Sequence, residues 1–467
     1  MMIPSFDVDE LARWSGGQWV SRPSRPLSAV VHDTRQVVPG ALFVAILGAR
    51  FDGHAFIGEA AQKGAGAALV SRDRCGEFAS LNIPLLLVED PACALRDIAT
   101  GYRLKLGLPV IGVTGSTGKT TVKEMIARLL ESAMPTARTK GNWNNEIGLP
   151  LSILAIPSES RAAVLELGIS HPGEMAPLCG IARPDWGVIT NVGPVHLEFF
   201  QSVEAIAREK GELFRSLPAG GTAVLSLDEP CFKLLHGLAP CRVVTTSLDP
   251  QSDADYVLVR ASRQGGECVV ADRIDAGTYS FRLPLPGAHN RHNALLAIAV
   301  ARGFGVTWDG IAAACEGLVA PPMRWECRDI GGFIIINDAY NANPVSMQAS
   351  LRTFREWEGA SRKWLALGDM LELGPGEIEA HRDIGRALAD GPWAGLVTVG
   401  VLGARMAEGA LAAGMSAELV QACGTVSEAA EYLKERMAKG DALLIKASRG
   451  KRLEDIIPGL LAGTEKG

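Results

Sequence analysis

An apolar run, a glycine-containing turn and a helical pattern follow one another near residue 115, and this segment constrains the fold more than any other. Residues 109–113 are expected to form a buried strand, and residues 119–130 have the apolar spacing of a helix. The turn between them is punctuated by Gly112, Gly115 and Gly118. Such a turn lets backbone N–H groups close on phosphate oxygens where the helix dipole is positive. The segment therefore predicts a nucleoside triphosphate site.

The polar side chains of this loop have distinct expected roles. Lys119 supplies a point charge for phosphate, and the hydroxyl of Thr120 lies where a Mg²⁺ ligand is needed. One position departs from the usual pattern, because Val113 stands where a glycine is common. The alternative is a glycine-rich turn without a ligand. The expected nucleotide contacts are Gly115, Ser116, Thr117, Gly118, Lys119, Thr120 and Thr121.

Composition excludes several classes of protein. The chain has 467 residues, of which 47% are hydrophobic and 21% charged, as in a soluble globular protein of about three domains. It has no apolar run long enough for a membrane span, and its start lacks a signal core, so we expect a cytoplasmic protein. A net charge of −6 gives no footprint for nucleic acid. The nine cysteines have no C-x-x-C spacing and are expected to be reduced core residues.

The chain divides into three segments with an α/β character. Residues 1–107 are expected to form a small α/β domain, and residues 108–318 a doubly wound parallel sheet around the phosphate loop. Residues 319–467, which begin beside a double proline, are expected to form a Rossmann-like domain. The expected strands are 40–46, 67–70, 162–167, 186–190, 222–227, 333–336, 364–367, 396–399 and 442–445. Helices are expected at 59–66 and 292–302, with an antiparallel addition at 256–286.

Three polar residues follow or interrupt strands of the middle segment. Glu166 stands in a buried-strand pattern, where a carboxylate is costly unless it meets a cation such as nucleotide-bound Mg²⁺. A structural ion pair is the alternative. His196 follows the next strand, and Lys210 comes fourteen residues later. Either residue, taken alone, is more often structural or solvated than catalytic.

Polar residues near the second junction extend this set. Asn290 and Asn293 share one helix face and could read an adenine edge, although helix capping is an alternative. Arg324 follows the double proline at a proposed hinge, where it could reach a phosphate. Asp338 closes a strand. Residues 367–374 and 446–450 also end strands, at the sheet edge where ligands bind.

Together these features resemble the Mur ligase family over nearly the whole chain. The family's phosphate loop, T-G-x-x-G-K-[TS], matches residues 114–120, which accounts for the missing glycine. The resemblance implies metal binding by Thr120, Glu166, His196 and a carbamylated Lys210. It further implies that adenine, phosphate and ribose are bound by Asn290, Asn293, Arg324 and Asp338.

Other stretches resemble particular members of that family. The first segment resembles the uridine-nucleotide domain of the later-acting ligases through Asp33, Thr34, Arg35, Asp52, Gly53 and His54. Residues 141–148, 338–344 and 367–374 resemble the member that adds D-alanyl-D-alanine to UDP-N-acetylmuramoyl-tripeptide. The dipeptide is then expected near Asn144, Asn145, Asp369 and Glu372. Asp369 or Glu372 could hold the dipeptide or only brace the loop.

The resemblance implies an ATP- and Mg²⁺-dependent amide ligase of peptidoglycan precursor synthesis that works through an acyl phosphate. Its catalytic residues would be Lys119, His196, Lys210 and Arg324, and we expect a monomer. A sister ligase that adds diaminopimelate or lysine, or a folylpolyglutamate synthetase, is the nearest alternative, although the chain lacks a D-N-P-R run. A GTPase switch would need an N-K-x-D motif, which the chain lacks. A non-catalytic binding module would not need this set of residues.

Overall fold

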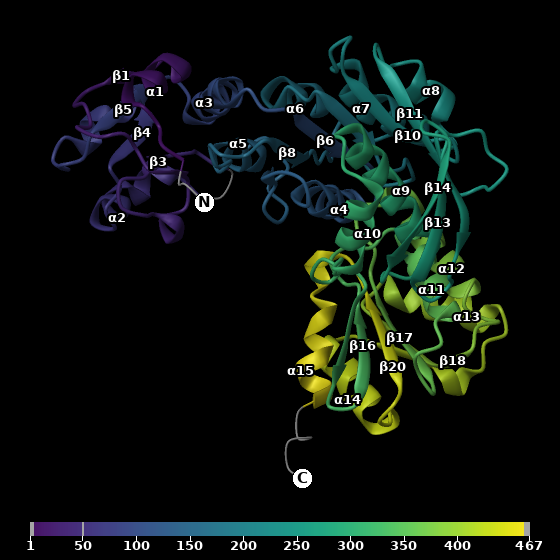
Figure 1. The fold of residues 1–467 in the computed structure, drawn as a ribbon. Helices are drawn as coiled ribbons and strands as arrows, with labels where there is room; N and C mark the ends of the chain where they lie inside the picture. The colour runs from purple at the N-terminus through teal and green to yellow at the C-terminus, as the bar shows by residue number, and fades with distance from the viewer. Residues whose placement is uncertain (1–3, 49–50, 462–467) are drawn as a thin grey trace.

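Three β-sheets, each with its own helices, follow one another along the chain in a computed structural model that describes residues 4–48 and 51–461. They are arranged as an arc, with the first sheet at one end, the middle sheet at the corner and the third at the other end (Figure 1). The predicted three-domain α/β fold is confirmed.

The first sheet has the order β1-β5-β4-β3-β2, and its strands are parallel except for the β1–β5 pair. Its strands are β1 (Gln18–Trp19), β2 (Val30–Val31), β3 (Leu42–Val44), β4 (Ala67–Ser71) and β5 (Leu85–Val88). Its helices are α1 (Val8–Ser15), α2 (Ile57–Gln62) and α3 (Pro91–Leu106). Two expected boundaries are wrong. The strand over 40–46 is shorter and the helix over 59–66 ends earlier, because Gly40 and Gly64 have φ of 82° and 90°.

The middle sheet has the order β14-β13-β12-β11-β10-β9-β6-β8-β7. Its strands are β6 (Val110–Thr114), β7 (Thr136–Arg138), β8 (Ala162–Glu166), β9 (Trp186–Ile189), β10 (Thr222–Ser226), β11 (Arg242–Ser247), β12 (Tyr256–Ala261), β13 (Gly266–Asp272) and β14 (Gly277–Leu283). Strands β12 to β14 pair antiparallel, so the predicted addition is confirmed. The remaining pairs are parallel.

Seven helices of the described residues accompany the middle sheet. They are α4 (Lys119–Glu131), α5 (Gly148–Leu154), α6 (Met175–Ala182), α7 (Val203–Arg215), α8 (Phe232–His236), α9 (Ala288–Gly303) and α10 (Trp308–Glu316). Helix α9 begins four residues before the expected position 292, because its N-cap is Gly287 with φ of 95°. The expected capping residues therefore lie inside the helix.

The third sheet has the order β15-β16-β20-β17-β18-β19, and the β15–β16 pair alone among its described pairs is antiparallel. Its strands are β15 (Glu326–Ile330), β16 (Phe333–Asn337), β17 (Lys363–Gly368), β18 (Trp393–Val399), β19 (Val420–Cys423) and β20 (Ala442–Lys446). Its helices are α11 (Pro344–Glu356), α12 (Glu377–Arg386), α13 (Gly403–Ala412), α14 (Val426–Arg436) and α15 (Ile456–Leu461).

Apolar cores join the first two sheets but not the third. One buried cluster runs from Phe6 through helix α3 to Leu235, and Tyr102 of α3 donates a hydrogen bond to the Ile156 carbonyl at 2.8 Å. The clusters under the third sheet contain residues of the third segment alone. Helix α3 is therefore a structural bridge between the first and middle domains.

The sequence predicted reduced cysteines in the core and no segment long and apolar enough to span a membrane. All nine cysteines are free, and four of them are buried. Cys93 and Cys327 are exposed, so the expectation of a core position was wrong for both. Cys93 lies in the first turn of α3, and Cys327 lies in the edge strand β15. Within the described part of the chain, no helix is both long and apolar enough to cross a membrane.

Candidate active site

The phosphate loop leaves the carboxyl end of β6, which lies between β8 and β9. The chain passes from β8 on one side of β6 to β9 on the other, and such a switch of direction opens a ligand crevice at this sheet edge. The loop after β9 braces the phosphate loop. Ser116 N–H donates to the Asn191 carbonyl, and Thr117 N–H donates to Asn191 Oδ1, both at 2.9 Å.

Two glycines of the loop are required by its conformation. Gly115 has φ of 150°, and a Cβ there would lie 1.9 Å from Thr190 Oγ1. Gly118 has φ of 79°, and a Cβ would lie 2.8 Å from Asn293 Oδ1. Val113, by contrast, is a fully buried residue of β6, which explains why a glycine is not needed there.

Lys119, Thr120 and Glu166 come together at the loop. Lys119 Nζ donates to the Gly115 carbonyl at 2.7 Å, and Thr120 Oγ1 donates to Glu166 Oε2 at 2.9 Å. Burial lowers the pKa of Lys119, Glu166 opposes this shift, and Arg324 adds to it. A lysine and a carboxylate therefore face one space, as expected for a nucleotide site.

A buried lysine that sequence reasoning missed lies behind Glu166. Lys123 is fully buried, and its Nζ is 3.9 Å from Glu166 Oε2 and 2.7 Å from the Thr139 carbonyl. It lies one helical turn after Lys119, so the i, i+4 spacing was the available signal. Asn144 Nδ2 donates to Glu166 Oε1 at 2.8 Å, which brings this predicted substrate residue to the carboxylate.

Lys210 lies in α7 and is only 1% exposed. No hydrogen bond or ion pair of its Nζ occurs among the described residues. Burial lowers its pKa well below the usual value, Lys119 lowers it further, and Glu209 opposes the shift. Glu209 is itself engaged, because its carboxylate accepts from the N–H groups of Gly173 and Met175. The structure thus contains a buried amine that favours the neutral form.

His196 follows β9 and contacts the third domain. Its Nδ1 is 2.7 Å from Glu372 Oε2. Burial lowers the pKa of His196, Glu372 raises it, and Lys210 and Lys119 lower it. His196, Lys210 and Lys119 therefore act on one another electrostatically.

Arg324 lies at the start of the third domain and reaches the phosphate loop. Its Nη2 donates to Thr120 Oγ1 at 2.9 Å, and its guanidinium lies 4.1 Å from the centre of the Tyr340 ring. The residues on either side, Met323 and Trp325, have φ of 59° and 58°, which is a costly backbone conformation for side chains of this size. The backbone is therefore strained on both sides of Arg324.

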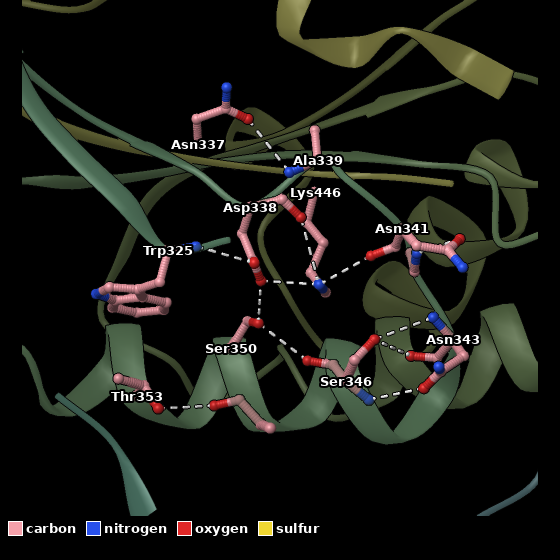
Figure 2. A network of polar contacts seen from close by, with 12 residues as sticks. Trp325, Asn337, Asp338, Ala339, Asn341, Asn343, Ser346, Ser350, Thr353 and Lys446 are labelled. Atoms are coloured by element: carbon pink, nitrogen blue, oxygen red, sulfur yellow. Dashed lines mark hydrogen bonds and ion pairs between the residues drawn. The ribbon is translucent and has the colours of Figure 1, made fainter. Parts of the chain in front are cut away.

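Asp338, which follows β16, is the centre of a polar network near Trp325 (Figure 2). Its Oδ1 accepts from Trp325 N–H at 3.0 Å, and its Oδ2 is 2.8 Å from Lys446 Nζ and accepts from the Ser350 hydroxyl. Lys446 is 2% exposed and also donates to the Asn341 carbonyl. Both carboxylate oxygens thus have protein partners, and Lys446 is a second buried cation that sequence reasoning did not assign.

The start of α9 lies between the phosphate loop and this network. Asn293 lies against Gly118, and Asn290 Nδ2 donates to the Pro286 carbonyl at 2.8 Å. Neither asparagine caps the helix, so the capping alternative is wrong. Burial lowers the pKa of His289 to about 4, while Asp338 opposes the shift and Lys446 adds to it. The electrostatic effects of Asp338 and Lys446 indicate that His289 lies near the third domain.

The predicted residues of the first domain are held by local contacts. Asp33 is bound by Arg35, whose hydrogen bonds lower the pKa of this carboxyl to about 2. Thr34 Oγ1 donates to Glu59 at 2.8 Å. These contacts lie far along the chain from the phosphate loop.

The other predicted group of the first domain is more deeply engaged. His54 is 3% exposed, its Nδ1 is 2.9 Å from Asp52 Oδ1, and its Nε2 accepts from Ser71 N–H at 3.1 Å. Burial works to raise the pKa of Asp52, but hydrogen bonds from His54 and Arg74 hold it lower, at about 2. A Cβ at Gly53 would lie 2.7 Å from the Ile46 nitrogen. These contacts stabilise the fold of the first domain, in addition to any contact that the group makes with a ligand.

The predicted dipeptide residues do not form one contact group. Asp369 is 2% exposed, accepts from Gly403 N–H at 2.7 Å and is paired with Lys451 at 2.6 Å. Asn145 Oδ1 accepts from the N–H groups that begin α5. These contacts favour a bracing role for Asp369, whereas Glu372 faces the middle domain.

Two cavities lie away from these side chains. One of about 880 Å³ is lined by residues 107–109 and 183–185 at the opposite end of the β6 strand, and another of about 470 Å³ by residues 131–137. Neither contains a predicted site residue. These two cavities are therefore separate from the predicted nucleotide site.

Three family models match consecutive parts of the chain. They describe the Mur ligase family catalytic domain (residues 26–103), the Mur ligase middle domain (residues 113–301) and the Mur ligase glutamate ligase domain (residues 323–449). A Bacillus subtilis protein named UDP-N-acetylmuramoyl-tripeptide--D-alanyl-D-alanine ligase is 38% identical over 93% of both chains.

The chain is also similar to solved structures of Mur ligases. A crystal structure of MurF from Acinetobacter baumannii has a TM-score of 0.88 and 28% identity, and covers 99% of this chain and 100% of its own. A crystal structure of MurF from Thermotoga maritima in complex with ADP has a TM-score of 0.80 and 30% identity, with coverage of 94% and 98%. The fold and site define a phosphate-loop enzyme of three α/β domains. The chain belongs to the Mur ligase family.

Proposed function

We propose that this protein is an ATP-dependent amide ligase that adds D-alanyl-D-alanine to UDP-N-acetylmuramoyl-tripeptide in peptidoglycan precursor synthesis. The observation that carries the proposal is the meeting of Lys119, Thr120 and Glu166 with Arg324, which comes from beyond the hinge. Relatives that match nearly the whole chain carry this activity in their names, and one solved relative holds ADP.

The proposed reaction depends on charge neutralisation and position. The tripeptide carboxylate attacks the γ-phosphorus of ATP, which gives an acyl phosphate and ADP. The neutral amine of the dipeptide then attacks the acyl carbon, the amide forms and phosphate leaves. Lys119 and Arg324 are the cations that would bind the phosphate oxygens, and the loop glycines allow their close approach. Closure of the third domain over the middle one would exclude water from the acyl phosphate.

The donor atoms at this edge suit Mg²⁺. Thr120 Oγ1 and Glu166 Oε2 lie 2.9 Å apart, and oxygen ligands of this type are the ones that Mg²⁺ prefers. Among the described residues, no group of three or more His, Cys, Asp and Glu side chains could hold a metal ion, so phosphate oxygens and water would complete the shell. Bound Mg²⁺ would neutralise charge on the transferring phosphoryl group. His196 and a carbamylated Lys210 are the proposed ligands of a second ion.

Carbamylation of Lys210 fits its surroundings. The amine must be neutral before it can react with CO₂, and the pKa of Lys210 is well below its usual value because of burial. The carbamate would carry negative charge beside Lys119, whose positive charge opposes a protonated Lys210. Carbamylation thus converts an unfavourable like-charge pair into a favourable one.

The remaining assignments belong to the same proposal. The first domain (residues 1–107) would hold the uridine and sugar through Asp33, Thr34, Arg35 and the group around His54, the middle domain (residues 108–318) would hold ATP, and residues 319–467 would supply Arg324 and Asp338. Asn290 and Asn293 would contact adenine, and the dipeptide would enter between the second and third domains near Asn144 and Glu372. The working form would be a cytoplasmic monomer.

A coupled assay of ADP release tests the proposal. The purified chain should release ADP with UDP-N-acetylmuramoyl-tripeptide and ATP, and the steady rate should require D-alanyl-D-alanine. Diaminopimelate with the UDP-dipeptide, and glutamate with a folate, are the comparison substrates for the sister activities. Faster release with either comparison pair would contradict the assignment.

A further inference from the structure

A hydrogen bond between His196 and Glu372 joins the middle and third domains. The Nδ1–Oε2 distance is 2.7 Å, and the two residues are 176 positions apart in the chain. Both have a left-handed backbone, with φ of 54° at His196 and 63° at Glu372. Such a conformation is uncommon for side chains like these and persists where surrounding contacts enforce it.

The loop that carries Glu372 is fixed from several sides. Asp369 is tied to Gly403 and Lys451, and Met370 N–H donates to His381 Nε2 at 2.9 Å. His381 is fully buried and its Nδ1 lies 2.6 Å from the Glu377 carbonyl, so both ring nitrogens are used. These contacts fix the chain at Asp369 and Met370, just before Glu372, and Glu372 itself contacts the middle domain.

The motif that ends β20 completes this support. Ser448 Oγ accepts from Leu371 N–H at 3.0 Å, and Ser448 N–H donates to the Asp369 carbonyl at 3.0 Å. On the far side of Glu372, a Cβ at Gly374 would lie 3.1 Å from the Glu198 Cα of the middle domain. The two strand-end motifs of the third domain therefore build one rigid platform whose tip contacts the loop of His196.

The chemistry of the pair defines which imidazole nitrogen is left for a ligand. An ionised carboxylate accepts hydrogen bonds and does not donate them, so His196 Nδ1 carries the proton and Nε2 has the free lone pair. A carboxylate in this position fixes the tautomer and ring orientation of metal-binding histidines and raises their basicity. Lys210 and Lys119 act electrostatically on the same imidazole.

We propose that Glu372 is a positioning residue that prepares His196 as a metal ligand only when the third domain is docked. This inference rests on the proposed metal role of His196. Metal binding and domain docking are then linked, because whatever docks the third domain improves the metal site and, by reciprocity, metal favours docking. Glu372 is assigned to the histidine and not to the dipeptide.

Glu372→Gly and Glu372→Gln test the proposal together. Glycine removes the carboxylate and suits φ of 63°, so the loop keeps its conformation, while glutamine keeps an acceptor but removes the charge. Glu418→Gln is the matched control, because Glu418 is an exposed glutamate of the third domain far along the chain from the platform. The probe is Mn²⁺, titrated by electron paramagnetic resonance into the full chain with saturating ADP and CO₂-supplied buffer.

We expect the Kd for Mn²⁺ to rise about 10- to 100-fold in Glu372→Gly, which is the usual cost of losing such a carboxylate, and by less in Glu372→Gln. The control should match the unmodified chain. Small-angle scattering should show that Mn²⁺ with ADP compacts the unmodified chain more than Glu372→Gly.

Different contrary results would overturn the role of Glu372 and the proposed ligase activity. An unmodified chain that releases ADP in the ligase assay while Glu372→Gly binds Mn²⁺ with unchanged affinity overturns this inference alone. An unchanged Mn²⁺ affinity with a raised KM for D-alanyl-D-alanine does the same and identifies Glu372 as a dipeptide contact. No Mn²⁺ binding by the unmodified chain removes the proposed metal role of His196 and this inference with it.

Discussion

His54 in the first domain and Lys210 in the middle domain are both almost completely buried, yet their surroundings differ. Both ring nitrogens of His54 have partners, in Asp52 and Ser71. Lys210 is 1% exposed, and no hydrogen bond or ion pair reaches its Nζ among the described residues. A buried polar group without a partner costs free energy, whereas a satisfied one stabilises the fold.

This difference separates two kinds of predicted site residue. Where the fold satisfies a buried polar group, as at His54 and Asp369, its removal should cost stability first. Where the fold gives a largely buried group no hydrogen bond or ion pair among the described residues, as at Lys210, its removal should cost activity first. The predictions below test that division, from the largest expected effect to the smallest.

Lys210→Ala should lower turnover by about 10³-fold, the upper end of what loss of one charge-stabilising group costs. The free energy of unfolding should stay the same or rise, because a buried amine without a partner is removed. ADP release and urea unfolding measure the two quantities. A short carboxylic acid in the buffer should restore part of the activity.

Arg208→Ala is the control on the same helix, since Arg208 is exposed and pairs with Glu204 alone among the described residues. It should leave turnover and stability nearly unchanged. A stable, active Lys210→Ala protein would break the comparison on its functional side.

Lys119→Ala should lower turnover by about 10²-fold, because a cation that stabilises charge on the phosphoryl group is lost. Its stability should change little, since the Nζ holds one carbonyl at 2.7 Å and burial lowers its pKa. ADP release measures the turnover, and urea unfolding measures the stability. Lys233→Ala, at an exposed position of α8, should behave like the unmodified chain.

His54→Ala should have the opposite profile. It leaves Ser71 N–H and one side of Asp52 without partners, which should cost about 2 kcal/mol of unfolding free energy, while kcat stays within a few-fold. Urea unfolding and steady-state kinetics measure these effects, with exposed His236→Ala as control. A raised KM for the uridine substrate at unchanged stability would show that His54 belongs with Lys210.

His289 gives the smallest effect and a pH dependence. Its pKa of about 4, lowered by burial, lies below the ordinary 6.5, so the unfolded chain binds the proton more strongly between these values. The stability contributed by neutral His289 is therefore complete above pH 6.5 and is lost as pH falls toward 4. Between pH 7 and pH 5 the loss should be about 1 to 2 kcal/mol.

His289→Asn should flatten that part of the pH profile of unfolding, measured by urea titration at several pH values. The facing charges of Asp338 and Lys446 stay in place in this variant. An equally steep profile would assign the pH dependence to other groups and would contradict the role given to His289.

The local patterns of the chain were enough to predict the sheets and the phosphate loop. Strand periodicity predicted β8, β10 and β17 to within one residue, because each is a continuous apolar run. Boundaries failed where a glycine adopts positive φ, as at Gly64 and Gly287. Propensity alone does not show which glycine will do so.

The contacts that assemble the site could not be predicted from local sequence patterns. Arg324 and Thr120 are 204 positions apart, so their hydrogen bond depends on how two domains dock. Lys123 was missed, and Lys446 was predicted only to lie at a ligand-binding strand end, because burial and not residue type makes these lysines important. The residues that resemble the family's motifs were predicted by that resemblance, whereas the partners that hold them required the fold.

The bridge formed by helix α3 has a consequence for how the molecule can be divided. The apolar cluster that includes Leu95, Ile98 and Tyr102 continues into the middle domain, while the clusters beneath the third sheet are separate. A cut after residue 107 would expose apolar surface on both fragments, whereas a cut near residue 321 would pass between cores. We therefore expect the first two domains to unfold as one cooperative unit, and the third domain to be the part that can be exchanged as a module.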